Sequence, residues 1–200
     1  MSLTPPAHLV LLPTGAGDPR PLPRGSVAQF HWGSFFPDSK RIAFTGNEEG
    51  KGPRLFVQDL AGGDPKPVSP EGVAAFAGNN VSPDGAFLAA SSDAGLALYA
   101  TAGGEPRPVS GAAPGDEPLR FSGDGRFLYV RNVPAEGRLA ANVFRLDLAS
   151  GTRELWKELA PAGASSSGRI TALTIAPEVG AYAYTFSEAI TTLYEVRGLQ

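Results

Sequence analysis

The residues of this chain that could carry out chemistry are few, and its acidic residues recur at regular spacing. An acid occupies the same place in a short motif four times, at Asp38, Asp84, Asp124 and Glu178. Carboxylates in a repeated loop could bind calcium, an ion that prefers several oxygen ligands. No further acids cluster beside them at the spacing of calcium ligands, so the sequence favours a role in turn geometry.

A nucleophilic active site finds little support in the sequence. The only histidines are His8 and His31, and cysteine is absent. The Gly-x-Ser-x-Gly motif of a hydrolase is missing, and the serine-rich run at 163–168 has a different spacing that indicates a loop. The glycines near 15–17 and 62–63 lack the Lys-Ser/Thr pair and the helix of a phosphate-binding loop. The sequence therefore predicts no catalytic residue, no metal ligand and no cofactor.

The recurring acids belong to a repeated turn. Its clearest copy is Ser-Pro-Asp-Gly at 82–85, and weaker copies stand at 36–39, 122–125 and 176–179. Proline presets φ at the first central position, aspartate bonds its own backbone, and glycine accepts the left-handed conformation. The copies are spaced at intervals typical of a β-propeller blade, which has a period of roughly 40 to 50 residues.

Each turn joins two predicted strands. The strand before the turn ends in a β-branched or aromatic residue, as expected for a buried contact. These residues are Phe35, Val81, Phe121 and Ile175. The strands after the turn are nearly continuously apolar, which suits strands covered on both faces. We expect them at 41–45, 86–90, 126–130 and 181–185.

A second repeated element follows each hairpin. It reads as a third strand, a glycine turn and a short outer strand, as in 55–60 followed by 61–68, or 96–99 followed by 102–109. Proline is tolerated in the outer strand because that strand is an edge, and it hinders pairing with other chains. The segment 153–159 is expected to be an outer strand rather than a helix.

We therefore predict an all-β fold. It is a β-propeller of about four and a half four-stranded blades, either a closed small ring or part of a larger propeller. Residues 1–7 are predicted to be disordered or derived from cloning, and residues 8–200 to form one domain. The expected parts are a half blade at 8–23, blades at about 27–69, 76–110 and 118–157, and an incomplete blade at 170–197.

Polar residues recur inside the predicted first strands, among apolar neighbours. Each stands three positions before the proline or glycine of its turn: Ser34, Asn80, Arg120 and Thr174. The first strands of a propeller line its central channel, so these side chains are expected to face it. Two interpretations stay open. The channel is simply hydrated, or its mouth binds a small ligand or peptide with the help of His31 and Trp32.

Composition limits the partners. The chain has 200 residues, of which 42% are hydrophobic, and its 25 glycines and 19 prolines fall mostly at the repeated turns. A net charge of −3 gives no basic surface for nucleic acid or anionic lipid. No apolar run of about 18 residues is present, so we expect no membrane insertion. The absence of cysteine fits either redox setting and leaves the compartment open.

The turn at 82–85 with its apolar strand, and the segment 55–63, resemble the WD-like propeller repeat of the TolB type. The resemblance covers the chain from about Leu9 to Val196. Such repeats occur in translocation proteins, in the non-catalytic propellers of prolyl-oligopeptidase-type peptidases and in signalling proteins. The resemblance therefore implies a fold rather than one function.

The C-terminal part, 170–199, looks like the last blade and chain end of bacterial eukaryotic-like serine/threonine protein kinases that carry a C-terminal propeller. In that family the kinase domain lies upstream, often with a membrane segment between. This chain has no Gly-rich loop with its lysine, no His-Arg-Asp loop and no Asp-Phe-Gly. The resemblance implies a non-catalytic sensor region, extracytoplasmic if joined to a membrane-anchored kinase, and offers no site residue to carry over.

We thus expect a module that binds a protein, a peptide or a small ligand, and no enzyme formed by this chain alone. The alternatives are the substrate-gating propeller of an S9-type peptidase and a TolB-like periplasmic scaffold. A short array of blades leaves apolar faces open. Either the N-terminal half blade closes a five-bladed ring with the C-terminal strands, or two chains pair as a homodimer through their open faces.

Overall fold

The computed structural model describes residues 8–75, 78–132, 141–160, 169–176, 178 and 180–188. In these residues every regular element is a β-strand, as predicted, and no helix capable of crossing a bilayer is found among them. The strands are β1 (Val10–Leu11), β2 (Arg20–Pro21), β3 (Val27–Phe35), β4 (Arg41–Glu48), β5 (Pro53–Asp59), β6 (Lys66–Pro67), β7 (Phe87–Ser92), β8 (Gly95–Ala100), β9 (Arg107–Pro108), β10 (Asp116–Phe121), β11 (Phe127–Asn132), β12 (Ala141–Asp147), β13 (Arg153–Leu159), β14 (Arg169–Ile175) and β15 (Tyr182–Ser187).

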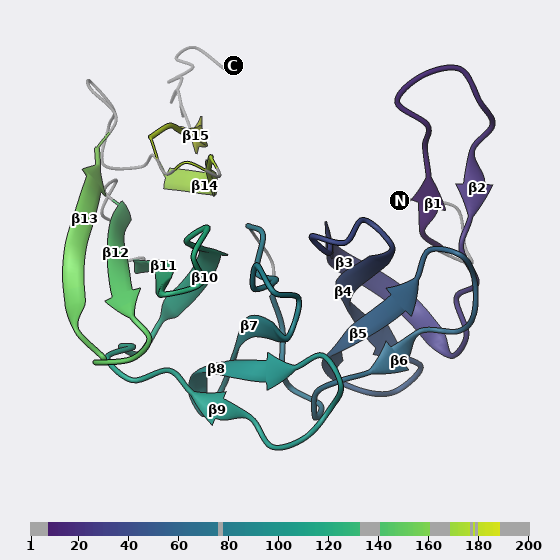
Figure 1. The fold of residues 1–200 in the computed structure, drawn as a ribbon, viewed down its shortest axis with the longest axis horizontal. Helices are drawn as coiled ribbons and strands as arrows, with labels where there is room; N and C mark the ends of the chain where they lie inside the picture. Colours follow the sequence, from purple (N-terminus) through teal and green to yellow (C-terminus); the bar gives the residue numbers. More distant parts are fainter. Residues whose placement is uncertain are drawn as a thin grey trace, which may run out of the picture.

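The strands form five antiparallel sheets that follow one another along an open arc (Figure 1). The sheets are β1–β2, β3–β6, β7–β9, β10–β13 and β14–β15, and each contains strands that are consecutive in the sequence. The two hairpins at the ends of the arc belong to separate sheets. Within the described residues, then, β1–β2 does not close a ring with β14–β15.

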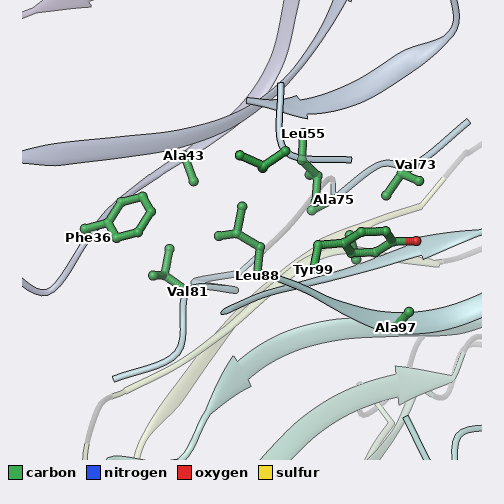
Figure 2. Close-up of a cluster of buried hydrophobic side chains, with 11 residues drawn as sticks. Phe36, Ala43, Leu55, Val73, Ala75, Val81, Leu88, Ala97 and Tyr99 are labelled. Atoms are coloured by element: carbon green, nitrogen blue, oxygen red, sulfur yellow. The ribbon is translucent and has the colours of Figure 1, made fainter. Parts of the chain in front are cut away.

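Buried apolar side chains fill the spaces between successive sheets in four groups. Figure 2 shows the group between sheets β3–β6 and β7–β9. Phe36 and Leu55 come from the first of these sheets, and Val81, Leu88 and Tyr99 come from the second. Burial of each such side chain stabilises the fold by roughly 1.5 to 3 kcal/mol. The core is therefore shared between neighbouring blades rather than held within each one.

The repeated turns have the hydrogen bonds that their sequence predicts. Asp84 Oδ1 accepts from Ser82 Oγ at 2.5 Å and from Ala86 N at 2.9 Å, and these bonds lower the pKa of the Asp84 carboxyl. Gly85 has φ = 69°, the left-handed conformation. The copy at 122–125 repeats this pattern around Asp124. The acids therefore serve the turn, as expected.

The inner strand of the third sheet differs from expectation. Among the described residues of this segment, which exclude 76 and 77, isolated bridges join Ala74 to Ser91 and Val81 to Leu88 in place of a continuous first strand. Gly78 lies between the two bridges, and its φ of 76° is outside the extended conformation of a strand. The next residue, Asn79, then bridges in parallel to Arg120 of β10, in the neighbouring sheet.

The outer strands are short in two blades and long in the third. Strands β6 and β9 contain two residues each, and in both the second residue is proline. Strand β13 has seven residues, which confirms that 153–159 is a strand. The predictions for residues 1–7 and for a last strand at 192–196 lie outside the described residues.

The residue that ends each first strand does not always meet the expected buried contact. Val81, Phe121 and Ile175 are buried, but Phe35 is 54% exposed. The three buried residues belong to the cores shared with the preceding sheet. The sheet before β3 is β1–β2, which contributes no inner strand among the described residues, so nothing there covers the Phe35 ring.

Candidate functional site

Strands β3 and β10, which contain Ser34 and Arg120, lie on the inner side of the arc, on either side of the third sheet (Figure 1). The structure shows that several of the polar residues of the first strands connect neighbouring blades. Ser34 Oγ donates to Asn79 Oδ1 at 2.9 Å, which joins β3 to the next inner segment. The backbone N–H of Asn79 donates to Leu119 O at 2.8 Å and continues the connection to β10.

Arg120 makes the next link of this series. Its Nη1 donates to Ile175 O of β14 at 2.6 Å, and its Nε donates to Phe121 O at 3.3 Å. Partial burial of the guanidinium lowers the pKa of Arg120, and the charge of Glu178 opposes that shift. Three successive blades are thus joined to their neighbours at the inner ends of their strands.

His31 and Trp32 lie at an irregularity of β3, where the pairing with β4 shifts register between Phe30 and Trp32. The Trp32 ring packs against the buried group between the first two complete sheets, and its Nε1 donates to Gly78 O at 3.0 Å. His31 is exposed, and its Nε2 donates to Asn47 Oδ1 at 2.5 Å. Trp32 therefore adds a further bond between blades, whereas His31 bonds within its own sheet.

Asn80 and Thr174 occupy different surroundings. Asn80 is fully buried, and its main-chain carbonyl oxygen accepts a hydrogen bond from Ala89 N at 2.9 Å. Thr174 is exposed on β14 and lines a hollow of about 340 Å³ together with Gly78 and Tyr184. The six residues that the sequence singled out therefore do not converge on one site.

A pocket of about 380 Å³ lies where the inner ends of three blades meet, and we call it the mouth pocket. Each blade contributes the end of its first strand and part of the following turn. The lining residues are Phe35, Phe36, Pro37, Ser39, Asn79, Val81, Pro83, Arg120, Phe121, Ser122 and Gly123. Of the predicted ligand-facing residues, the mouth pocket contains Arg120, and Ser34 reaches it through Asn79.

Asn79 is the polar residue of the mouth pocket that sequence analysis missed. The repeated position is occupied by Asn80, and the turn of the chain at Gly78 brings Asn79 to the inner surface instead. A glycine directly before two asparagines was the available signal, since glycine in a strand often marks a local irregularity.

The mouth pocket has no recognisable catalytic machinery in the part of the chain that the structure describes. Its hydroxyls are those of Ser39 and Ser122, and Ser122 Oγ donates to Asp124 Oδ1 at 2.5 Å within the turn. None of the described residues that line it is a histidine, a lysine or an acid. A search of the described residues also found no group of three histidine, cysteine or acidic residues that could hold a metal ion.

No protein-family model and no curated protein sequence matches the chain. Among solved structures it is similar to a protein assigned as TolB from Agrobacterium tumefaciens, at 14% identity and a TM-score of 0.59, over 88% of this chain and 67% of that one. TolB from Acinetobacter baumannii is similar at 16% identity and a TM-score of 0.59, over 90% of this chain and 47% of that one. The tricorn protease matches at 13% identity and a TM-score of 0.50, over 83% of this chain and 16% of that one.

These similarities concern the fold. They confirm the predicted TolB-like β-propeller, with its consecutive antiparallel blades. The chain spans about half the length of the Acinetobacter baumannii TolB and about two thirds of the Agrobacterium tumefaciens protein. At such identities the activity of a similar protein says nothing about this one.

Proposed function

We propose that this chain is a non-catalytic binding module, which receives a polypeptide segment or a small ligand in the mouth pocket. The observation that carries the proposal is the presence, in one pocket shared by three blades, of polar donors on Asn79 and Arg120 beside the exposed Phe35 ring. Binding pockets in proteins are typically concave and largely apolar, with a few placed polar groups that orient the ligand.

The lack of a nucleophile beside a base supports a binding role over catalysis. Covalent catalysis needs a nucleophile within hydrogen-bond reach of a general base. In the mouth pocket the one bonded hydroxyl, Ser122 Oγ, donates to an aspartate that also accepts Arg126 N at 3.1 Å. Those bonds hold the turn together and lower the pKa of Asp124, which makes it a poor base.

For the parent protein we propose a bacterial serine/threonine kinase with a C-terminal propeller, on the resemblance at 170–199. The genomic reading frame tests this. A kinase domain upstream is the expected result, and an extracytoplasmic location would follow from a membrane segment between the two. A hydrolase domain downstream would overturn the kinase assignment in favour of an S9-type peptidase, and neither domain would favour a TolB-like scaffold.

The binding role is tested by an NMR titration of the ¹⁵N-labelled chain with a set of short peptides of varied sequence. We expect backbone amide shifts concentrated at Phe35, Asn79 and Arg120, and their loss in the Phe35→Ala variant. Leu155→Ala is the matched control, because Leu155 is 57% exposed but lies on β13, outside the mouth pocket. Shifts that cluster elsewhere, or survive Phe35→Ala, would overturn the proposal.

A further inference from the structure

Asn79 is held in one orientation by its neighbours. Its Oδ1 accepts a hydrogen bond from Ser34 Oγ at 2.9 Å and a second from Val81 N at 3.4 Å. Its backbone N–H is fixed to Leu119 O at 2.8 Å. Because Oδ1 already accepts these two bonds, Nδ2 is the side-chain group of Asn79 that can bond to a ligand in the mouth pocket. It donates to no atom of the described residues. An amide nitrogen can only donate, so Asn79 presents a donor to a ligand.

Arg120 presents further donors at the same place, since Asn79 and Arg120 form a parallel bridge. A guanidinium carries five N–H groups. Two of the nitrogens of Arg120 donate to carbonyl oxygens, Nη1 to Ile175 O and Nε to Phe121 O. No bond from its Nη2 is found within the described residues, so part of the planar fork remains for a ligand in the mouth pocket.

Arg120 is not among the arginines that form ion pairs in the described residues. Six others form ion pairs with a carboxylate: Arg41, Arg54, Arg126, Arg131, Arg145 and Arg153. No ion pair of Arg120 occurs within the part of the chain that the structure describes. Partial burial removes water from its charge and lowers the pKa of Arg120, and the charge of Glu178 offsets only part of that effect, so a bound anion would offset the remainder.

The three aspartates of the turns that form the mouth pocket are already engaged in bonds of their own. The carboxylates of Asp84 and Asp124 accept hydrogen bonds from the serine and the backbone of their own turns. Asp38 pairs with Arg41 at 2.8 Å. These bonds draw the acids into the turns, while the donors of Asn79 and Arg120 line the mouth pocket itself.

We propose that the mouth pocket selects a carboxylate carried next to an apolar group on a polypeptide, an inference that rests on the binding role proposed above. The Nη2 group of Arg120 and the Nδ2 group of Asn79 each donate to one carboxylate oxygen, and Phe35, Pro37 and Pro83 contact the apolar group. Hydrogen bonds between a guanidinium and a carboxylate are charge-assisted and therefore stronger than neutral ones. Two sources can supply the carboxylate: the C-terminus of a chain, or an acidic side chain within it.

Three acetylated peptides separate these possibilities. The first is Ala-Ala-Phe with a free C-terminal carboxylate, the second is the same peptide with a C-terminal amide, and the third is Ala-Glu-Phe with a C-terminal amide. Affinities for the 200-residue chain are measured by NMR titration at one salt concentration. We expect at least one carboxylate-bearing peptide to bind about tenfold or more tightly than the neutral amide, which is the range of a charged hydrogen bond.

Two variants tie the preference to the pocket. Asn79→Asp keeps an oxygen for Ser34 but replaces the Nδ2 donor with a second negative oxygen, so the carboxylate preference should fall about tenfold while the neutral peptide is unaffected. Arg120→Gln should also lower the carboxylate preference about tenfold and leave the affinity for the neutral peptide unchanged. The control is Arg107→Gln, because Arg107 lies on the outer strand β9, over the Phe87 ring and outside the mouth pocket. Thermal melting checks that each variant is folded.

The outcomes distinguish this inference from the function on which it rests. A preference for the free C-terminus alone identifies a chain end as the ligand, and a preference for Ala-Glu-Phe alone identifies an acidic side chain. Equal binding of all three peptides in the mouth pocket would overturn the carboxylate inference and leave the binding role intact. If none of them shifts the pocket amides at millimolar concentration, both proposals are overturned. A preference that persists in Asn79→Asp and Arg120→Gln also contradicts the inference.

Discussion

Asp116 and Arg153 form a two-pronged ion pair within the sheet β10–β13. Nη1 of Arg153 contacts Oδ2 of Asp116, and Nη2 donates to Oδ1 at 3.0 Å. The Asp116 carboxylate also accepts hydrogen bonds from Asn132 Nδ2 at 2.9 Å and from Ala113 N at 2.8 Å. The Asp116 side chain is 0% exposed. Because Asp116 begins β10 and Arg153 begins β13, the pair ties the innermost strand of the blade to the outermost one.

Replacing Asp116 with alanine should destabilise the protein by about 3 kcal/mol. The reason is that removal of one partner leaves the Arg153 charge largely buried without compensation. Urea unfolding measures the change. The control is Glu154→Ala, which breaks the exposed pair between Arg145 and Glu154 and should cost less than about 1 kcal/mol. Equal losses in the two variants would show that the buried pair has no special role.

Gly78→Ala should destabilise the protein more than a comparable substitution at another glycine. Gly78 has φ = 76°, and a Cβ there would collide with the backbone of Leu119 in the next blade. Gly103 has φ = 85° but nothing near the place of a Cβ. Gly103→Ala should cost about 1 to 2 kcal/mol for the left-handed backbone alone, and Gly78→Ala about 1 to 3 kcal/mol more for the collision.

Urea unfolding of the two alanine variants provides this test. A similar midpoint for both would mean that the close contact between Gly78 and Leu119 can relax at little cost, and that the blades are less tightly joined there than the backbone geometry indicates.

The free energy of unfolding should decrease at acidic pH because the Asp147 carboxylate becomes protonated. This carboxylate accepts Ser150 N at 3.1 Å and Ala149 N at 3.0 Å, and it pairs with Arg126 at 2.8 Å. The bond from the Ser150 backbone, followed by that from Arg126, lowers the pKa of Asp147 from 3.8 to about 2. A lowered pKa means that the folded state favours the ionised form. This stabilisation is complete above about pH 4 and is lost as the pH falls toward 2.

The measurement is the difference in unfolding free energy between the protein and its Asp147→Asn variant, followed from pH 5 to pH 2. The difference should shrink as the pH falls, because protonation removes the same interactions as the substitution. A difference that stays constant over this range would contradict the assignment of these contacts to the ionised carboxylate.

The open end of the arc should promote self-association. Every residue of β15 is exposed, and Tyr182, Tyr184 and Phe186 are large apolar side chains among them. Apolar faces of this kind favour association with another surface. Light scattering of the purified chain at several concentrations should therefore detect a dimer at high concentration, and Tyr184→Ser should weaken it. A monomer at every concentration would rule out pairing of two chains through these faces.

The sequence predicts the local parts of this structure better than the contacts between blades. The bonds of Ser82, Asp84 and Gly85 lie within a few residues of one another, so the motif alone is enough to identify the turn. The mouth pocket depends instead on Asn79 and Arg120, which are far apart in the chain. Their bridge follows from the turn of the backbone at Gly78, and no repeat alignment reveals that displacement.

The candidate residues show the same limit. Ser34 and Arg120 bond to Asn79 and Ile175 of neighbouring blades, and the sequence does not predict the identity of these partners. His31 was grouped with them by proximity in the sequence. In the structure His31 bonds to Asn47 of its own sheet, whereas Trp32 bonds to the neighbouring blade.

The bonds that join the inner strands end mostly on main-chain oxygens. Trp32 donates to Gly78 O, Asn79 N donates to Leu119 O, and Arg120 donates to Ile175 O. A carbonyl oxygen is present in every residue, so the accepting blade can change its side chains without losing the bond. Blades of this kind can diverge in sequence after duplication and still dock on their neighbours. The last repeat has Pro177-Glu178-Val179 where the others keep aspartate, and the blade before it nevertheless remains bonded to Ile175.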